Sequence, residues 1–335
     1  TNSLAGMTGG AAAPPADIAG AGFTDALGPT PIVFAGDHPS SETDNPELCG
    51  AGTIGDFDSP WGPDEFDGEI VVCIRGDFGR VEKGANVLAA GAGGFVLIDD
   101  GGGLVGDPHE LPGVHITAED GAGLLDWLAG GTGHVAAIGG ATLDESVANA
   151  DILAGFSSRG PNRSVPAMIA PSVAAPGVDI IAADGINGAV SWGFNSGTSM
   201  ASPHAAGAGA LLVGMHPDWT PAEVQSALMT TGTTNVVRED GVTPATPFDQ
   251  GSGRIRVDAA TDAGLLFDIP NSDFAAVDPG SGGDPSTLNL PSMANDQCVL
   301  ECSWTRMVEA TTAGTWTAAA TADGFGVTVE PTSFT

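Results

Sequence analysis

The stretch that decides the fold is Asn195-Ser-Gly-Thr-Ser-Met-Ala-Ser-Pro-His204, which runs directly into Ala205-Ala-Gly-Ala-Gly-Ala-Leu-Leu-Val-Gly-Met215. Gly197 allows a tight backbone turn. Pro203 is expected near the first turn of a helix, where a missing N–H group costs least. The run after it is uncharged on every side, which predicts a helix buried on all sides. The sequence therefore places Ser199 at the amino end of a central buried helix.

A serine at that position suits acyl transfer. Unpaired N–H groups and the positive end of the helix dipole lie at the amino end of a helix, and both stabilise an oxyanion that forms beside an acyl ester. We therefore expect Ser199 to be a nucleophile, although serines also cap helices. His204 lies five positions further along. We expect it to face the core as a structural histidine, because a general base must lie within hydrogen-bond reach of its target.

The segment Ser196-Gly-Thr-Ser-Met-Ala-Ser-Pro-His204 resembles the nucleophile motif of the subtilase family of serine proteases. Four further segments resemble that family in the expected order: Phe156-Ser-Ser-Arg-Gly-Pro161, Ala174-Ala-Pro-Gly-Val178, Thr220-Pro-Ala-Glu-Val-Gln-Ser-Ala-Leu228 and Phe248-Asp-Gln-Gly-Ser-Gly-Arg-Ile-Arg-Val-Asp258. The resemblance implies an α/β, subtilisin-like parallel-sheet domain that hydrolyses peptide bonds through an acyl-enzyme on Ser199. It also implies that Thr198, next to Gly197, either lends its hydroxyl to the oxyanion or is a plain turn residue.

Two further regions resemble domains that accompany subtilases. A protease-associated domain, an α+β insertion, is indicated by Cys49, Cys73, Gly68-Glu-Ile-Val-Val-Cys-Ile-Arg-Gly76, Ala89-Ala-Gly-Ala-Gly-Gly94 and Leu111-Pro112. A C-terminal fibronectin-III-like β-sandwich is indicated by Leu288-Asn-Leu-Pro-Ser292 and Trp304-Thr-Arg306. We therefore expect four regions: a connecting segment of the catalytic domain (1–30), the protease-associated domain (31–138), the C-terminal part of the catalytic domain (139–268) and a truncated sandwich (269–335).

The residue pattern supports these regions. Residues 1–30 show no clear periodicity, and from Pro31 short apolar runs alternate with helical patterns. We expect strands at 31–34, 68–75, 94–99, 114–117 and 135–138, with helices at 83–91 and 122–128. Strands and helices are also expected to alternate over 139–268. The helix that begins after Thr220 has a capping box with Glu223 and a hydrophobic staple between Trp219 and Val224.

The family's catalytic aspartate, histidine and oxyanion asparagine precede the protease-associated insertion, and nothing ahead of Pro31 resembles them. Asn2 stands in Thr-Asn-Ser and is not assigned to the oxyanion. We therefore expect this chain to be a fragment of a serine endopeptidase that is inactive alone. The alternative is a non-catalytic binding module or pseudo-protease that uses the protease-associated and sandwich domains. An esterase of the α/β-hydrolase type is excluded because no GxSxG motif is present.

Composition limits the partners. The chain of 335 residues has 42 acidic and 9 basic side chains, a formal net charge of −33, and Lys83 is its only lysine. Such a surface repels nucleic acid and anionic membranes. It favours solubility in salty water, with a specific cationic partner as the alternative. Protein or peptide substrates are the expected partners, and the oligomeric state stays open. The longest apolar helix candidate, 205–215, is too short to span a bilayer.

Four cysteines permit three disulfide pairings, of which Cys49–Cys73 and Cys298–Cys302 are the simplest. A zinc site would need tighter clustering with histidines. Disulfides suit an oxidising, extracellular or periplasmic setting, so we expect a secreted or extracellular protein. No metal or cofactor is assigned. His38, His109, His115 and His134 are expected to be ordinary histidines, and the acidic stretch 56–67 to be a solvated loop rather than a calcium site. The family resemblance makes calcium an expectation without a position.

Overall fold

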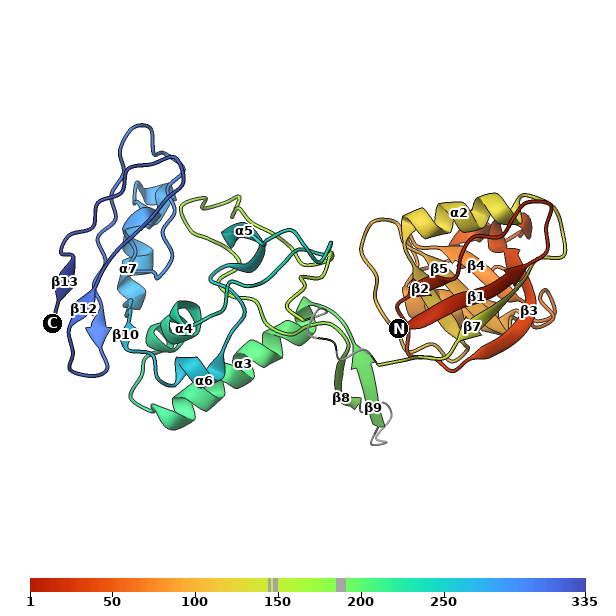
Figure 1. Ribbon diagram of the computed structural model, residues 1–335, viewed down its shortest axis with the longest axis horizontal. Coiled ribbons are helices and arrows are strands. Elements are labelled where there is room, and N and C mark those ends of the chain that lie inside the picture. Colours follow the sequence, from red (N-terminus) through yellow and green to blue (C-terminus); the bar gives the residue numbers. More distant parts are fainter. Residues whose placement is uncertain (144–145, 147–149, 185–190) are drawn as a thin grey trace. The chain divides into compact units, whose positions relative to one another are not determined.

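The computed structural model describes residues 1–335 except 144–145, 147–149 and 185–190 (Figure 1). The chain divides into two compact units. The first comprises Thr1–Ser157, Pro176–Ser202 and Val237–Thr243, and the second comprises Ser158–Ala175, Pro203–Val236 and Pro244–Thr335. Among the described residues, no helix is both long and apolar enough to cross a membrane.

The first unit is built on a seven-stranded mixed sheet with the strand order β2-β1-β7-β3-β4-β5-β6. Its strands are β1 (Asn2–Thr8), β2 (Ile18–Gly20), β3 (Leu27–Phe34), β4 (Ile70–Ile74), β5 (Gly94–Ile98), β6 (Gly113–Ile116) and β7 (Val135–Gly139). The pairs from β3 to β6 are parallel, and β7 pairs antiparallel with β1 and β3. Ala21 and His115 form an isolated antiparallel bridge that joins the chain after β2 to β6. The strands expected between 31 and 138 are therefore confirmed.

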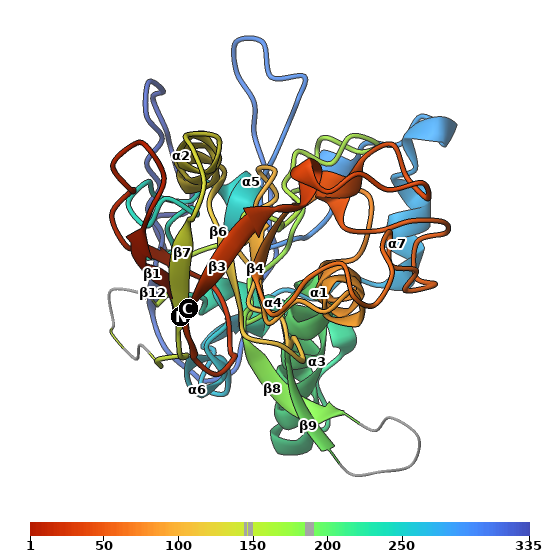
Figure 2. The same ribbon diagram turned by 90° about the vertical axis from the view of Figure 1, so that its right-hand side faces the viewer.

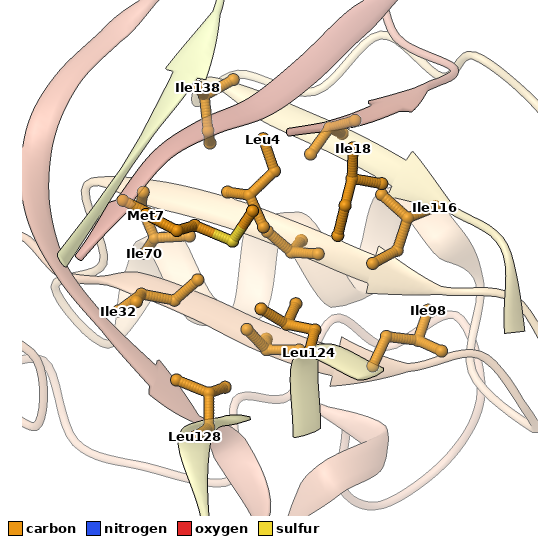
Figure 3. Close-up of a cluster of buried hydrophobic side chains, with 14 of the residues drawn as sticks. Leu4, Met7, Ile18, Ile32, Ile70, Ile98, Ile116, Leu124, Leu128 and Ile138 are labelled. Atoms are coloured by element: carbon orange, nitrogen blue, oxygen red, sulfur yellow. The ribbon is translucent and has the colours of Figure 1, made fainter. Parts of the chain in front are cut away.

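Two helices cover opposite faces of this sheet, α1 (Arg80–Ala89) and α2 (Ala118–Leu128) (Figure 2). Successive residues of a strand point to opposite faces, and β4 follows this rule. Ile70 and Val72 enter a core cluster with Leu124 of α2 (Figure 3). Val71 enters the other cluster with Val87 of α1. Because both faces are apolar, β4 and β5 read in the sequence as unbroken apolar runs. The mixed sheet covered by helices confirms the α/β class.

Residues 1–30 carry structure that the sequence did not predict. Strand β1 is an internal strand next to one edge of the sheet, between β2 and β7. Leu4 and Met7 are buried there, and the strand's apolar alternation is too short to stand out from the Ala- and Gly-rich surroundings. Asn2 is 2% exposed. Its amide donates to the carbonyls of Thr24 (3.0 Å) and Gly139 (2.8 Å), so it ties the strand to its neighbours.

Short elements complete the first unit: the 3-10 turns η1 (Ala35–Asp37) and η2 (Pro46–Leu48), and the antiparallel pair β8 (Ile180–Asp184) and β9 (Ser191–Asn195). The second unit contains α4 (Pro221–Thr230), α5 (Pro247–Gln250), α6 (Val257–Ala260) and β10 (Leu265–Leu266). Its core combines Leu212, Ala227, Leu228, Ile255 and Leu266 with smaller neighbours. Strands are scarce in the described part of 139–268, so the expected alternation is only partly present.

The tail has no β-sandwich, contrary to our expectation for 269–335. It contains α7 (Asn271–Ala276), the 3-10 turns η5 (Pro279–Ser281) and η6 (Pro285–Thr287), and three strands of two residues each: β11 (Glu309–Ala310), β12 (Trp316–Thr317) and β13 (Ser333–Phe334). These form separate two-stranded pairs, β10–β11 and β12–β13. An isolated two-stranded pair is only marginally stable in water, because three or more strands are needed to bury an apolar face. Leu300 and Phe325 accordingly remain 96% and 74% exposed.

Candidate active site

The predicted nucleophile lies at the start of α3 (Thr198–Met215). Strand β9 ends at Asn195, a turn through Ser196 and Gly197 follows, and the helix begins at once. The Gly197 carbonyl accepts hydrogen bonds from the amides of Met200 (2.9 Å) and Ala201 (3.3 Å), so Gly197 caps the helix. Ser199 is its second residue and is exposed to solvent.

Thr198, the first residue of α3, is also exposed. The first amides of any helix have no acceptor within the helix, and the positive end of the dipole lies there. Both residues therefore lie where an oxyanion would be stabilised. Pro203 is the sixth residue of α3 rather than part of its first turn. Because proline has no N–H group, the carbonyl of Ser199 lacks the usual helical hydrogen bond from four residues on.

A loop ahead of β8 holds the turn in place. The Gly197 amide donates to the Gly177 carbonyl (2.7 Å). The backbone amide of Asp179 donates to the hydroxyl of Ser196 (2.8 Å), and that hydroxyl donates back to the Asp179 carboxylate (3.1 Å). The approach at Gly177 is close: an added Cβ would lie 2.9 Å from the Gly197 carbonyl oxygen and 3.1 Å from the Ala201 side chain. The loop and the turn therefore form one local unit.

The electrostatics of this unit centre on Asp179. The residue is exposed, but local desolvation raises the pKa of its carboxyl above the ordinary value, and the hydrogen bond from Ser196 acts in the opposite direction. Its backbone φ is 54°, in the left-handed region that asparagine and aspartate tolerate best. Neither Asp179 nor the part played by Ser196 was recognised from the sequence. Asp179 directly follows the family-like segment Ala174–Val178, which was the one available signal.

Helix α3 is present as predicted, but it is not buried on all sides. Ala208 and Leu212 are buried against α4 and its neighbours, whereas Leu211, Val213 and Met215 are 60%, 50% and 61% exposed. These side chains stay exposed because the other elements of the second unit pack against only one side of a helix that is apolar on all sides.

His204 is exposed, so our expectation that it faces the core was wrong. The exposed apolar surface of α3 explains this, because the side expected to be covered is open to solvent. Five residues of α-helix correspond to a rotation of about 140° from Ser199. This rotation directs the two side chains to different sides of the helix, so the structure does not bring His204 to Ser199 as a base.

The remaining site residues are the cysteines. Cys49 and Cys73 form a disulfide with their Cα atoms 5.9 Å apart, and both are fully buried in the core beside α1. Cys298 and Cys302 form the second, with their Cα atoms 5.5 Å apart. The structure thus contains the simplest of the three pairings.

The part of the chain that the structure describes contains no group of three or more His, Cys, Asp or Glu side chains arranged to hold a metal ion. Within the acidic stretch 56–67, the Phe57 amide donates to the Glu82 carboxylate of α1 (3.3 Å). His38 pairs with Glu65 at 2.7 Å. Of the other three histidines of the first unit, His109 is partly exposed, and His115 and His134 are buried.

The family model described as the subtilase family matches residues 54–253. Three Arabidopsis thaliana proteins illustrate the similarity. Subtilisin-like protease SBT5.4 is 37% identical, covering 63% of this chain and 30% of the relative. The proteases SBT1.6 and SBT1.7 are 34% and 33% identical, covering 80% and 90% of this chain and 36% and 44% of the relatives. The chain thus spans less than half the length of these relatives. The family match includes the turn and the start of α3 with Ser199, and by it this chain belongs to the subtilase family.

Proposed function

We propose that this chain is the nucleophile-bearing part of a secreted serine endopeptidase that cleaves protein substrates. The observation that carries the proposal is the position of Ser199. Its side chain is exposed at the second residue of α3, in a segment within the family match. Two disulfides support an oxidising, extracellular location.

The chemistry follows from that position. The Ser199 hydroxyl oxygen attacks the peptide carbonyl carbon while a histidine takes its proton, and an aspartate orients the histidine. The tetrahedral oxyanion is stabilised by the Ser199 amide and an asparagine side chain. Collapse breaks the C–N bond, the histidine protonates the leaving amine, and water then hydrolyses the ester. We place the histidine, aspartate and asparagine in the part of the protein outside this chain.

Two observations support a larger active protein. The chain spans 30–44% of the length of the relatives described above. In addition, α3 exposes Leu211, Val213 and Met215, a surface that further parts of a catalytic domain would cover. Because the members of a triad act as one unit, the 335-residue chain alone is expected to have lost about 10⁴-fold or more in turnover.

A fluorophosphonate probe tests this proposal, because the activated serine oxygen displaces fluoride from its phosphorus. We expect the full-length protein to be labelled rapidly at Ser199 and the 335-residue chain slowly or not at all. Ser199→Ala should abolish labelling. Ser202→Ala is the matched control, since Ser202 is exposed on the same helix, and it should leave labelling intact. A full-length protein that binds peptides but is never labelled would favour a binding module or pseudo-protease.

A further inference from the structure

The position of Ser199 depends on the turn just before it. Gly197 caps α3 through its carbonyl while its own amide is held by the Gly177 carbonyl. Ser196 is the residue before it, and its hydroxyl makes two hydrogen bonds to one partner, accepting from the Asp179 amide and donating to the Asp179 carboxylate. Because the Ser196 hydroxyl both accepts from and donates to Asp179, it restrains the position of the turn at Ser196 relative to Asp179.

Asp179 has an unusual backbone conformation. Its φ of 54° lies in the left-handed region, which costs an L-residue energy and persists where the surroundings determine it. The amide and the carboxylate of Asp179 reach the same hydroxyl. The contacts from Gly177 and Asp179 therefore hold the turn at Ser196 and Gly197, two residues before the nucleophile.

We propose that Asp179 is a positioning residue: through Ser196 it holds the turn that sets the place of the Ser199 hydroxyl and of the first amides of α3. The inference rests on the function proposed above, because it concerns the reactivity of Ser199. Displacing reacting atoms by about 1 Å can cost about 100-fold in rate. Loss of the clamp should therefore lower the rate of acylation.

The test compares Asp179→Ala, Ser196→Ala and the double variant in the full-length protein. We expect each single variant to slow fluorophosphonate labelling and kcat for a peptide by about 10- to 100-fold, with KM nearly unchanged. The double variant should be no slower than the slower single variant, because the Asp179 carboxylate acts through the Ser196 hydroxyl, which Ser196→Ala already removes. Asp179→Asn keeps an acceptor oxygen and tolerates the left-handed conformation, so it should restore most of the rate.

A stability measurement separates positioning from general support. If the variants only melted at lower temperature, while the folded protein was labelled at the wild-type rate, the inference would be overturned. Independent, multiplicative losses in the double variant would overturn it as well. Ser196→Ala, a change of one oxygen atom at the turn, carries the test if Asp179→Ala does not fold. A wild-type protein that is never labelled at Ser199 would instead sink the proposed function, and this inference with it.

Discussion

The guanidinium of Arg159 and the carboxylate of Asp249 lie 3.0 Å apart and join two family-like segments of the second unit. Asp249 is 3% exposed, and its carboxylate also accepts hydrogen bonds from the amide and hydroxyl of Thr246. The pair is therefore an internal connection rather than a surface contact.

Asp249→Asn should destabilise the protein by about 2–4 kcal/mol, because the buried carboxylate accepts charge-assisted hydrogen bonds from Arg159 and Thr246 that a neutral amide replaces only in part. Urea unfolding at pH 7 measures the change. The matched control is Asp258→Asn, since Asp258 pairs with Arg256 at the same 3.0 Å but on the surface. Exposed pairs contribute little, so the midpoint of the control should hardly move. Equal shifts in the two variants would contradict the assignment.

Lys83 should make stability rise with pH in the alkaline range. Its side chain is fully buried, its ammonium donates to the Leu48 carbonyl, and burial lowers its pKa from 10.5 to about 8. Between these values the unfolded chain binds a proton that the folded chain has released. The free energy of unfolding should therefore increase from pH 8 to 10.5, by at most about 3 kcal/mol.

A change of stability between pH 8 and 10.5 can be assigned to Lys83, because Lys83 is the only lysine and the chain has no tyrosine. Urea unfolding at pH 8 and pH 10.5 should show the rise in the wild type. Lys83→Met keeps the length of the side chain but cannot titrate, so its stability should stay flat over the same interval. An equal rise in Lys83→Met would show that another group is responsible.

Elements whose determining residues are adjacent in the sequence could be predicted. The capping box of α4 was predicted from adjacent residues, and the structure has it: the Glu223 amide donates to the Thr220 hydroxyl at 3.2 Å, and the Thr220 amide donates to the Glu223 carboxylate at 2.7 Å. The strand at 68–75 and the helix at 83–91 were likewise visible as local patterns.

Features that depend on distant partners could not be predicted in the same way. The burial of α3 was overestimated. An apolar sequence shows that all sides of a helix can be buried, but it does not show which parts of the chain cover them. Strand β1 was missed because its place in the sheet is set by β7, more than 120 residues away. The contact between Asp179 and Ser196 joins positions 17 residues apart, and neither residue type indicates it alone.

Thr198 should contribute to the rate if its hydroxyl donates to the oxyanion. In the full-length protein, Thr198→Val would then lower kcat by about 100-fold with little change in KM, while Thr198→Ser would keep most of the activity. Peptide hydrolysis kinetics decide the matter. Nearly wild-type kcat in Thr198→Val would identify a plain turn residue.

Salt should stabilise this protein. Its formal net charge of −33 creates repulsion in the folded state, and raising the ionic strength from 0.1 M to 1 M shortens the screening length from about 10 Å to about 3 Å. We expect the melting temperature to rise over that range in both NaCl and KCl. A flat response would rule out the screening explanation.

The most direct measurement is peptide hydrolysis by the full-length protein with Ser199 intact or replaced by alanine, beside the Ser202→Ala control. We predict that Ser199→Ala lowers kcat/KM by about 10⁴-fold or more, while Ser202→Ala stays close to the wild type. Hydrolysis that persists at the wild-type rate in Ser199→Ala would show that the Ser199 hydroxyl does not carry the acyl group.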